Sequence, residues 1–411
     1  MKRLVLYGVG RESEKFKYQY EIKKGVNSFK RDFLFAIDQN FDGTFYSIPV
    51  YNPNEVLNLR EYFIVVCCVE HNYIVIKEML REKGLKEFEN FIWYTLYEKK
   101  LCLINTNCHG RPIKTFLLNS KDFMSIYGVY PIDIVSDYSA KEINESLLPR
   151  VDLYIHQVIS PDNCFGISLS DKYVLPRLGD DCIRICIPNF WNLKEIGKTF
   201  FPSQTDEYPN WEHKNNWPIF YRDRLIDEAY LISEEKGKKD IKSIMDYIDN
   251  YQFNRDEVHN NFLSFINKIK LYDERYDIKV STFIEKEYKT TQMFTDSRHP
   301  SKALLTYICT AVGTKLGLTD INRAIKKSLR LDEWGDYGLE SPVWPGIKRI
   351  LGISYKEDSF KDNSLYGNLR CDNGHNFSYG IDIREFIKEY VYLFWNCILE
   401  EDENSRFDNC D

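Results

Sequence analysis

The stretch Leu101-Cys102-Leu103-Ile104-Asn105-Thr106-Asn107-Cys108-His109-Gly110-Arg111 decides how the middle of this chain folds. A run typical of a buried strand leads directly into a polar turn with a glycine, and a helix is predicted to follow through Leu118. Strands that alternate with helices indicate a parallel sheet with helices on its faces. We therefore predict an α/β domain over residues 99–352. Its further strands are expected at residues 126–132, 151–157 and 182–188.

Residues 1–98 are predicted to form a smaller, Rossmann-like α/β unit with its own parallel sheet. The strand Leu4-Val5-Leu6-Tyr7 precedes a turn that contains Gly8 and Gly10, and a polar helix follows. This turn is a shortened dinucleotide fingerprint, in which Ser13 replaces the third glycine and Asp38 lies at the distance of a ribose-binding acid. Two interpretations remain open. The unit binds a nucleotide through Gly8, Gly10 and Asp38, or it is an accessory domain that packs or docks.

The second half of the chain is predicted to be mainly helical. Apolar and charged residues recur at helical spacing over residues 255–288, and another helix is expected over residues 301–316, before Gly317. A final helix is expected near residues 383–399. We predict that residues 353–411 form a C-terminal extension that packs on the domain before it.

Composition and charge exclude several classes of protein. The chain has 411 residues and a formal net charge of −7, which argues against a general nucleic-acid binder. No apolar run has the roughly 20 residues that a membrane span needs. The eleven cysteines follow no signal peptide and form no CxxC pair. We therefore predict a cytoplasmic protein with reduced thiols, no integral membrane segment and no bound metal.

Cys108 is the candidate nucleophile. It is expected between a strand and a helix, where the helix N-terminus would stabilise the thiolate and lower the pKa of the thiol. Asn107, Gly110 and nearby backbone N–H groups could then form an oxyanion hole. The alternative is that Cys108 is a small buried hydrophobe. That alternative suits the cysteines inside apolar runs better, namely Cys102, Cys182, Cys186 and Cys309.

The candidate acid–base pair is Asp296 and His299. A carboxylate three residues before a histidine can reach its Nδ1, which leaves Nε2 able to take a proton. This Asp-x-x-His arrangement resembles the acid–base end of SGNH-type hydrolases and acyltransferases, which place a serine where this chain has Cys108. A thiol suits exchange with a thioester better than it suits ester hydrolysis. The alternative for these two residues is a helix cap beside a hydrogen-bonded surface histidine.

Taken together, residues from about Leu101 to Gly352 resemble the WcbI-like family of predicted acetyltransferases of capsular polysaccharide biosynthesis. The resemblance departs at His109, because the family has Asn-Cys-Gln-Gly where this chain has Asn107-Cys108-His109-Gly110. The other matching segments are residues 151–157, 187–190, 201–204, 276–284, 293–294, 299–301 and 341–346.

The resemblance implies coenzyme A as a cofactor, bound as acetyl-CoA. Its phosphates need cationic donors, and the nearest candidates are Arg111, Lys114 and Arg298, each of which could equally be a solvated surface charge. Gln157, at the end of its strand, is expected to line the site or to cap a buried loop. His109 and Gly110 are expected beside the cofactor.

The implied activity is acetyl-CoA-dependent O-acetylation of a sugar hydroxyl, on a glycan or nucleotide-sugar acceptor for a capsule or another surface polysaccharide. The first domain could dock the enzyme to the assembly machinery. Two alternatives stay open. One is an SGNH-like esterase that removes acetyl groups from glycans, and the other is a non-catalytic protein that binds a nucleotide sugar or docks to a partner.

Overall fold

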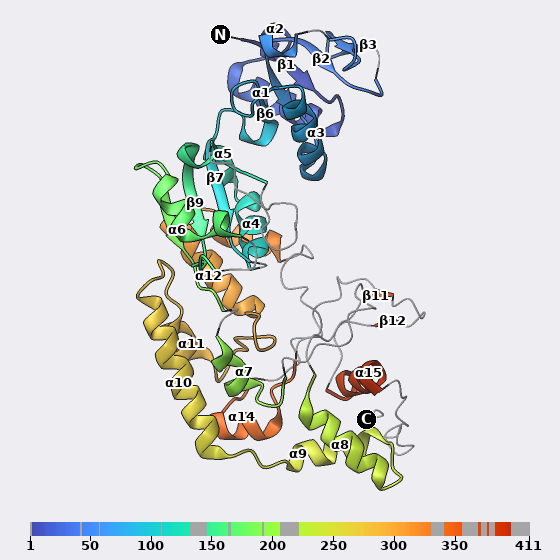
Figure 1. The fold of residues 1–411 in the computed structure, drawn as a ribbon, viewed down its shortest axis with the longest axis vertical. Coiled ribbons are helices and arrows are strands. Elements are labelled where there is room, and N and C mark those ends of the chain that lie inside the picture. The colour runs from blue at the N-terminus through green and yellow to red at the C-terminus, as the bar shows by residue number, and fades with distance from the viewer. Residues whose placement is uncertain are drawn as a thin grey trace.

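The fold has three tiers along the long axis of the molecule: a first sheet, a second sheet and a set of helices (Figure 1). We analysed a computed structural model, in which Cys108 lies outside the described residues. The described residues are 2–41, 43–56, 58–107, 109–131, 146–162, 166–190, 193–205, 222–329, 341–355, 369–370, 376–377 and 383–395.

In the first tier, the described strands form one sheet in the order β3-β4-β2-β1-β5-β6. Every neighbouring pair is parallel except β3 and β4. The parallel strands therefore follow the order of a doubly wound dinucleotide-binding sheet. This confirms the predicted α/β class. The elements are β1 (Arg3–Tyr7), α1 (Arg11–Lys24), α2 (Ser28–Asp32), β2 (Phe33–Ile37), β3 (Gly43–Phe45), β4 (Ile48–Tyr51), β5 (Tyr62–Val66), α3 (Glu70–Glu82) and β6 (Phe91–Trp93).

The glycine turn after β1 is stabilised by close backbone packing and by the side chain of Asp38. Gly8 has a φ of +93°, and a Cβ on it would lie 2.7 Å from the carbonyl oxygen of Cys67. Asp38 Oδ2 accepts a hydrogen bond from the Val9 backbone N–H at 2.9 Å, and Oδ1 accepts one from the Asn40 N–H at 2.9 Å. The carboxylate predicted to bind a ribose thus stabilises the turn itself. Nucleotide binding by Gly8, Gly10 and Asp38 stays a prediction.

Replacing Gly8 by alanine should strain this turn. The Gly8→Ala variant would need a left-handed φ and a displaced Cys67 carbonyl, so we expect it to lose about 2 kcal/mol of unfolding free energy. Gly10→Ala is the control, because Gly10 has a φ of −110° and open space around its Cα. Urea unfolding of both variants tests this prediction, and equal losses would contradict it.

In the second tier, the described strands form a sheet in the order β10-β9-β7-β8, with every pair parallel. The strand order reverses at β7, because β8 lies on one side of it and β9 on the other. Open α/β sheets bind ligands at such a switch point, beyond the carboxyl ends of the strands. The elements are β7 (Lys100–Asn105), α4 (Gly110–Asn119), α5 (Lys121–Ile126), β8 (Tyr127–Val129), β9 (Val151–His156), α6 (Asp171–Val174) and β10 (Ile183–Cys186).

The two sheets share one apolar core, so the first unit is packed on the second. That core contains Val5 and Ile64 from the first sheet together with Leu103 from β7. Polar contacts cross the same junction. Tyr130 donates to Glu87 at 2.8 Å, and the Lys114 ammonium lies 2.7 Å from a Glu70 carboxylate oxygen.

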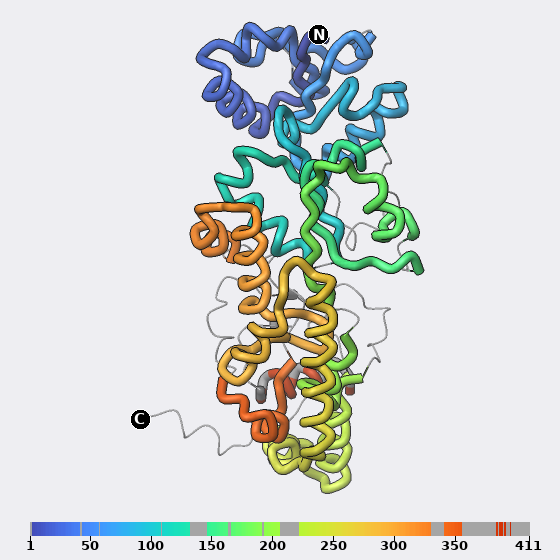
Figure 2. The backbone as a smooth tube through the Cα atoms, turned by 90° about the vertical axis from the view of Figure 1, so that its left-hand side faces the viewer, coloured from blue at the N-terminus to red at the C-terminus, as the bar shows by residue number. Residues whose placement is uncertain are grey.

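The third tier is helical, as predicted, and α10 is a long rod along it (Figure 2). The helix expected over residues 255–288 is interrupted after Asp273, because its carboxylate accepts hydrogen bonds from the backbone N–H groups of Val280 and Ser281 and so caps a second helix. The helices of this tier are α7 (Lys194–Phe200), α8 (Arg224–Glu235), α9 (Ile241–Asn250), α10 (Arg255–Asp273), α11 (Ser281–Glu287), α14 (Pro345–Leu351) and α15 (Ile383–Trp395), whereas α12 (Lys302–Lys315) and α13 (Ile321–Ser328) pack on α4 of the second tier.

The helix α15 contacts the third tier, and a short hairpin of β11 (Leu369–Arg370) and β12 (Asn376–Phe377) precedes it in the chain. Tyr390 is fully buried in a core shared with α8 and α9. Its hydroxyl accepts from the Asp223 backbone N–H at 2.7 Å, and Trp395 Nε1 donates to Asp227 at 2.8 Å. The C-terminal helix therefore closes the apolar face of α8.

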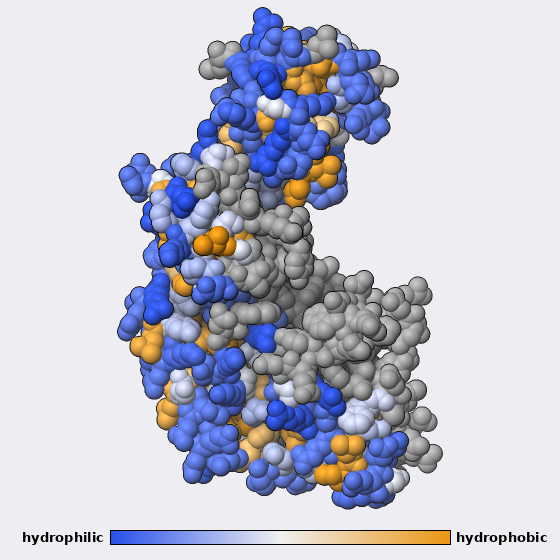
Figure 3. Space-filling view, viewed as in Figure 1, coloured by the Kyte–Doolittle hydropathy of each residue, from blue (hydrophilic) through white to orange (hydrophobic). Residues whose placement is uncertain are grey.

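The described surface is mainly hydrophilic on the face in Figure 3, where apolar residues form separate spots. Among the described helices, none has the length and apolar character that crossing a membrane requires.

Candidate functional site

The side chain of Gln157 joins the loops that follow three neighbouring strands. It lies directly after β9 and is fully buried. Its Oε1 accepts from the Asn107 backbone N–H at 2.9 Å, in the loop after β7. Its Nε2 donates to the Pro188 carbonyl at 2.7 Å, in the loop after β10, and lies 3.3 Å from His109 Nδ1. Gln157 thus fixes the geometry at the carboxyl end of the second sheet.

The Asn107 side chain continues this network. Its Oδ1 accepts from the His109 backbone N–H at 3.0 Å, and its Nδ2 donates to Asn189 Oδ1 at 3.3 Å. The Gly110 N–H donates to the Asn107 carbonyl at 2.9 Å. The backbone N–H groups of residues 107, 109 and 110 therefore all have acceptors within the chain. The side-chain amide of Asn107 carries a second N–H, which leaves it as the candidate oxyanion donor.

Asp296 and His299 make the contact that their spacing predicts. Asp296 Oδ2 lies 2.7 Å from His299 Nδ1, while Oδ1 accepts from the backbone N–H groups of Arg298 and His299 at 2.7 and 2.9 Å. Both side chains are almost wholly buried. The carboxylate therefore orients the imidazole and also holds the turn, as the predicted contact requires. The helix-cap alternative does not describe this pair, because Ser301 caps α12 and His299 is buried. A histidine held in this way directs its proton chemistry to Nε2.

His109 brings the loop after β7 against the Asp296–His299 turn. Its ring centroid lies 6.0 Å from that of His299, edge to face. Burial and the nearby His299 lower the pKa of His109, whereas a hydrogen bond to the Arg298 backbone raises it. The two lowering effects are larger, so the pKa lies well below its usual value of 6.5. His109 therefore stays neutral where an ordinary histidine is protonated, and it is a poor competitor of His299 as a base.

The predicted cofactor-binding residues lie in different places. Gly110 begins α4 against Thr106, where a Cβ would overlap the threonine hydroxyl. Arg111 is exposed in the first turn of α4. The Lys114 ammonium is bound by Glu70 of the first unit, away from His299. Arg298 lies in the turn with Asp296 and His299. Cys108 lies outside the described residues, although its two neighbours in the chain belong to the network.

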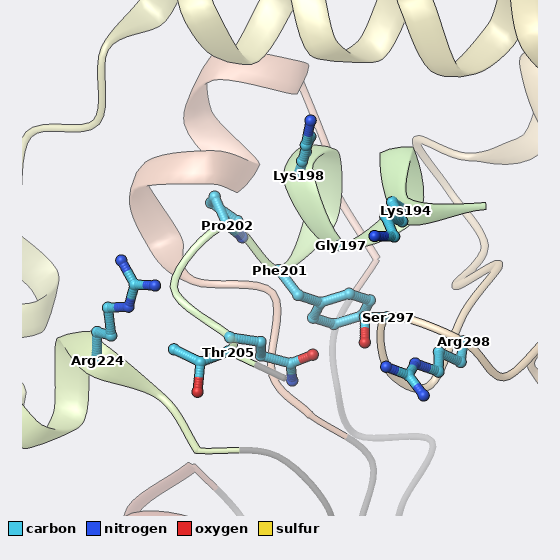
Figure 4. A pocket seen from close by; sticks show the side chains of 10 residues that line it. Lys194, Gly197, Lys198, Phe201, Pro202, Thr205, Arg224, Ser297 and Arg298 are labelled. Atoms are coloured by element: carbon cyan, nitrogen blue, oxygen red, sulfur yellow. The ribbon is translucent and has the colours of Figure 1, made fainter. Parts of the chain in front are cut away.

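A cavity of about 470 Å³ opens beside this turn (Figure 4). Ser297 and Arg298 contribute to it from the turn, and Phe201 comes from the end of α7. Four cationic side chains and no acidic one line it, as far as the described residues go. The lining residues are Lys194, Gly197, Lys198, Phe201, Pro202, Gln204, Thr205, Arg224, Ser297 and Arg298.

Sequence reasoning missed Asn189 as a partner of Asn107, and it missed the cavity lysines. The segment around Asn189 was noted only as part of a resemblance, and polar residues after the last strand of a parallel sheet are a usable signal for a site. Lys194 and Lys198 are four residues apart in a short helix, a spacing that also suits a solvated face. Their position beside Arg298 comes from the tertiary fold alone.

The neutral state of His109 predicts how stability depends on pH. The unfolded chain binds a proton at His109 below about pH 6.5, whereas the folded chain does so only at lower pH, so the unfolding free energy falls as pH falls below 6.5. His109→Gln removes the titrating group, and we expect the variant to lose less stability between pH 7 and pH 5 than the original chain. Urea unfolding across that range provides the test. The same slope in both proteins would contradict this assignment.

The chain is similar to one family of known proteins. The family model described as polysaccharide biosynthesis enzyme WcbI matches residues 101–320. A similar solved structure is that of WcbI, a polysaccharide biosynthesis enzyme, described as the native protein without a disulfide bond between coenzyme A and a cysteine. Its sequence is 14% identical to this chain, and the TM-score is 0.47. The similarity covers 73% of this chain and 91% of that one. No curated protein matches the chain.

Proposed function

Because this chain belongs to the family of the polysaccharide biosynthesis enzyme WcbI, we propose that it transfers an acyl group, most simply acetyl, from coenzyme A to a sugar hydroxyl. The observation that carries this proposal is the meeting of the loop after β7 with the Asp296–His299 pair, seen in the 6.0 Å approach of His109 to His299. We place the reaction in the cytoplasm.

The proposed mechanism uses His299 as the base. Asp296 holds Nδ1, so Nε2 takes a proton, either from the Cys108 thiol or directly from the sugar hydroxyl. In the first route the acyl–sulfur bond to coenzyme A breaks as the Cys108 sulfur accepts the acyl group, and the sugar oxygen then displaces the Cys108 sulfur. In each transfer the proton held on His299 Nε2 passes to the sulfur that leaves. In the second route the sugar oxygen accepts the acyl group directly. In both routes a side-chain N–H of Asn107 stabilises the negative charge that develops on the acyl oxygen.

The donor set around the site fits coenzyme A. When bound, the coenzyme supplies an acyl group activated as a thioester. Arg111 is an exposed cation in the first turn of α4, a ten-residue helix whose N-terminus suits anionic groups. It would hold a phosphate of the coenzyme on the Cys108 side of the site. Lys114 is a weaker candidate than its position in the sequence suggests, because Glu70 already binds its ammonium group.

Replacing Cys108 should abolish acyl transfer if the thiol accepts the acyl group. We expect Cys108→Ala to reduce kcat by at least about a thousandfold with an unchanged melting temperature. Cys182→Ala is the matched control, because Cys182 is half-buried directly before β10 and should be dispensable. Turnover by Cys108→Ala equal to that of the parent enzyme would exclude the thiol as nucleophile and favour direct attack by the sugar.

The competing activity is an esterase that removes acetyl groups from glycans with the same residues and water as acceptor. A hydrolase has no need of coenzyme A, whereas a transferase must bind it. A thermal-shift titration therefore separates the two, and we expect the melting temperature to rise with the concentration of coenzyme A. Acetyl ester hydrolysis without any such shift would favour the esterase.

A further inference from the structure

The cavity beside the Asp296–His299 turn is the strongest unexplained feature of the described structure. It is built from α7, the segment before residue 206, the start of α8 and the turn that carries His299. Gly197 of α7 sits so close to that turn that a Cβ on it would lie 3.1 Å from the Cβ of Ser297. The cavity and the proposed base therefore share one element, and its position relative to His299 is fixed by packing.

The cavity is cationic although the chain as a whole is acidic. Lys194 and Lys198 are one helical turn apart on α7, and Arg224 lines the same cavity from the first turn of α8 (Figure 4). No ion pair engages these three side chains within the part of the chain that the structure describes. Cations that line one cavity from separate elements without an ion-pair partner favour a bound anion.

The acidic residues beside these cations in the sequence are turned to other partners. Glu195 accepts from Lys268 at 2.8 Å. Asp223 is buried and accepts from Ser203 at 2.9 Å and from Trp344 at 3.1 Å. Asp296 is bound to His299. The cavity is therefore positively charged, because each of these three carboxylates binds another partner and none of them lines the cavity.

Gln204 provides the cavity with a hydrogen-bond acceptor that a ligand could use. Gln204 lines the cavity, and its buried side-chain oxygen has no hydrogen-bond partner among the described residues. A buried acceptor without a partner is costly, and a sugar hydroxyl would satisfy it. The cavity thus offers cationic side chains that can bind an anionic group and an acceptor that can bind a hydroxyl. The apolar ring of Phe201 also lines it.

We propose that this cavity binds a phosphorylated sugar as the acyl acceptor, with Lys198 and Arg224 on its phosphate and Gln204 on a hydroxyl. The proposal rests on the proposed acyltransferase function. The base must contact the hydroxyl that it deprotonates, and the cavity lies on the His299 side of the site. Arg111 lies in the first turn of α4, after the loop of β7, where the acyl donor is expected. The volume of about 470 Å³ lies in the range of about 300–1,000 Å³ typical of small-molecule sites.

Calorimetric titration of the full chain with glucose 1-phosphate, glucose, inorganic pyrophosphate and coenzyme A tests this proposal. We expect glucose 1-phosphate and pyrophosphate to bind, and glucose to bind at least tenfold more weakly than its phosphate. Arg224→Glu should weaken glucose 1-phosphate at least tenfold and change the affinity for coenzyme A less than twofold. Lys198→Glu, on a different helix, should act in the same way.

Lys236→Glu is the matched control, because it makes the same charge change at the opposite, exposed end of α8. It should alter the binding of glucose 1-phosphate less than twofold. The proposal is overturned if neither phosphate probe binds the parent chain, or if both cavity variants bind glucose 1-phosphate as the parent does. It is also overturned if they weaken coenzyme A alone, which would assign the cavity to the acyl donor. Failure of acyl transfer with intact phosphate binding would instead refute the proposed function.

Discussion

The hydrogen bonds of the Gln157 side chain are the constraint on which the site depends. One buried amide holds the loops after β7, β9 and β10 at fixed distances, through Asn107 and Pro188. Each of these loops begins where a parallel strand ends, so the sheet sets their positions and Gln157 sets their conformations. Losing either bond would leave a buried polar group without a partner, which costs about 1–3 kcal/mol. The protein's own hydrogen bonds therefore hold Asn107 and Pro188 in place on either side of Gln157.

Burial and a neighbouring carboxylate give the two histidines of the site different roles. His109 packs in the core of the network, where burial lowers its pKa and keeps it neutral. His299 lies against it but is held by the Asp296 carboxylate at Nδ1, which leaves Nε2 as the atom that can take a proton. A cationic cavity next to the same turn completes a site that can take a proton and hold an anion.

Much of this architecture could be predicted from the sequence, because local patterns carry it. Apolar runs such as Leu101–Asn105 located the strands, and Asp296 and His299 are close in sequence, so their contact depends on one turn. The interruption after Asp273 was missed, because its cause is a carboxylate that caps the following helix. The pairing of Lys114 with Glu70 was also missed. It joins two separate units, and the sequence contains no local signal for such a contact.

The central claim is that the Cys108 thiol meets the Asp296–His299 pair. The most direct measurement is the rate of alkylation of Cys108 by iodoacetamide as a function of pH, resolved by peptide mass spectrometry. Cys68 is the internal reference, because burial raises its pKa to about 12. The account predicts that Cys108 reacts at much lower pH than Cys68 and that Asp296→Asn moves its profile to higher pH. A profile of Cys108 that Asp296→Asn leaves unchanged would contradict the account.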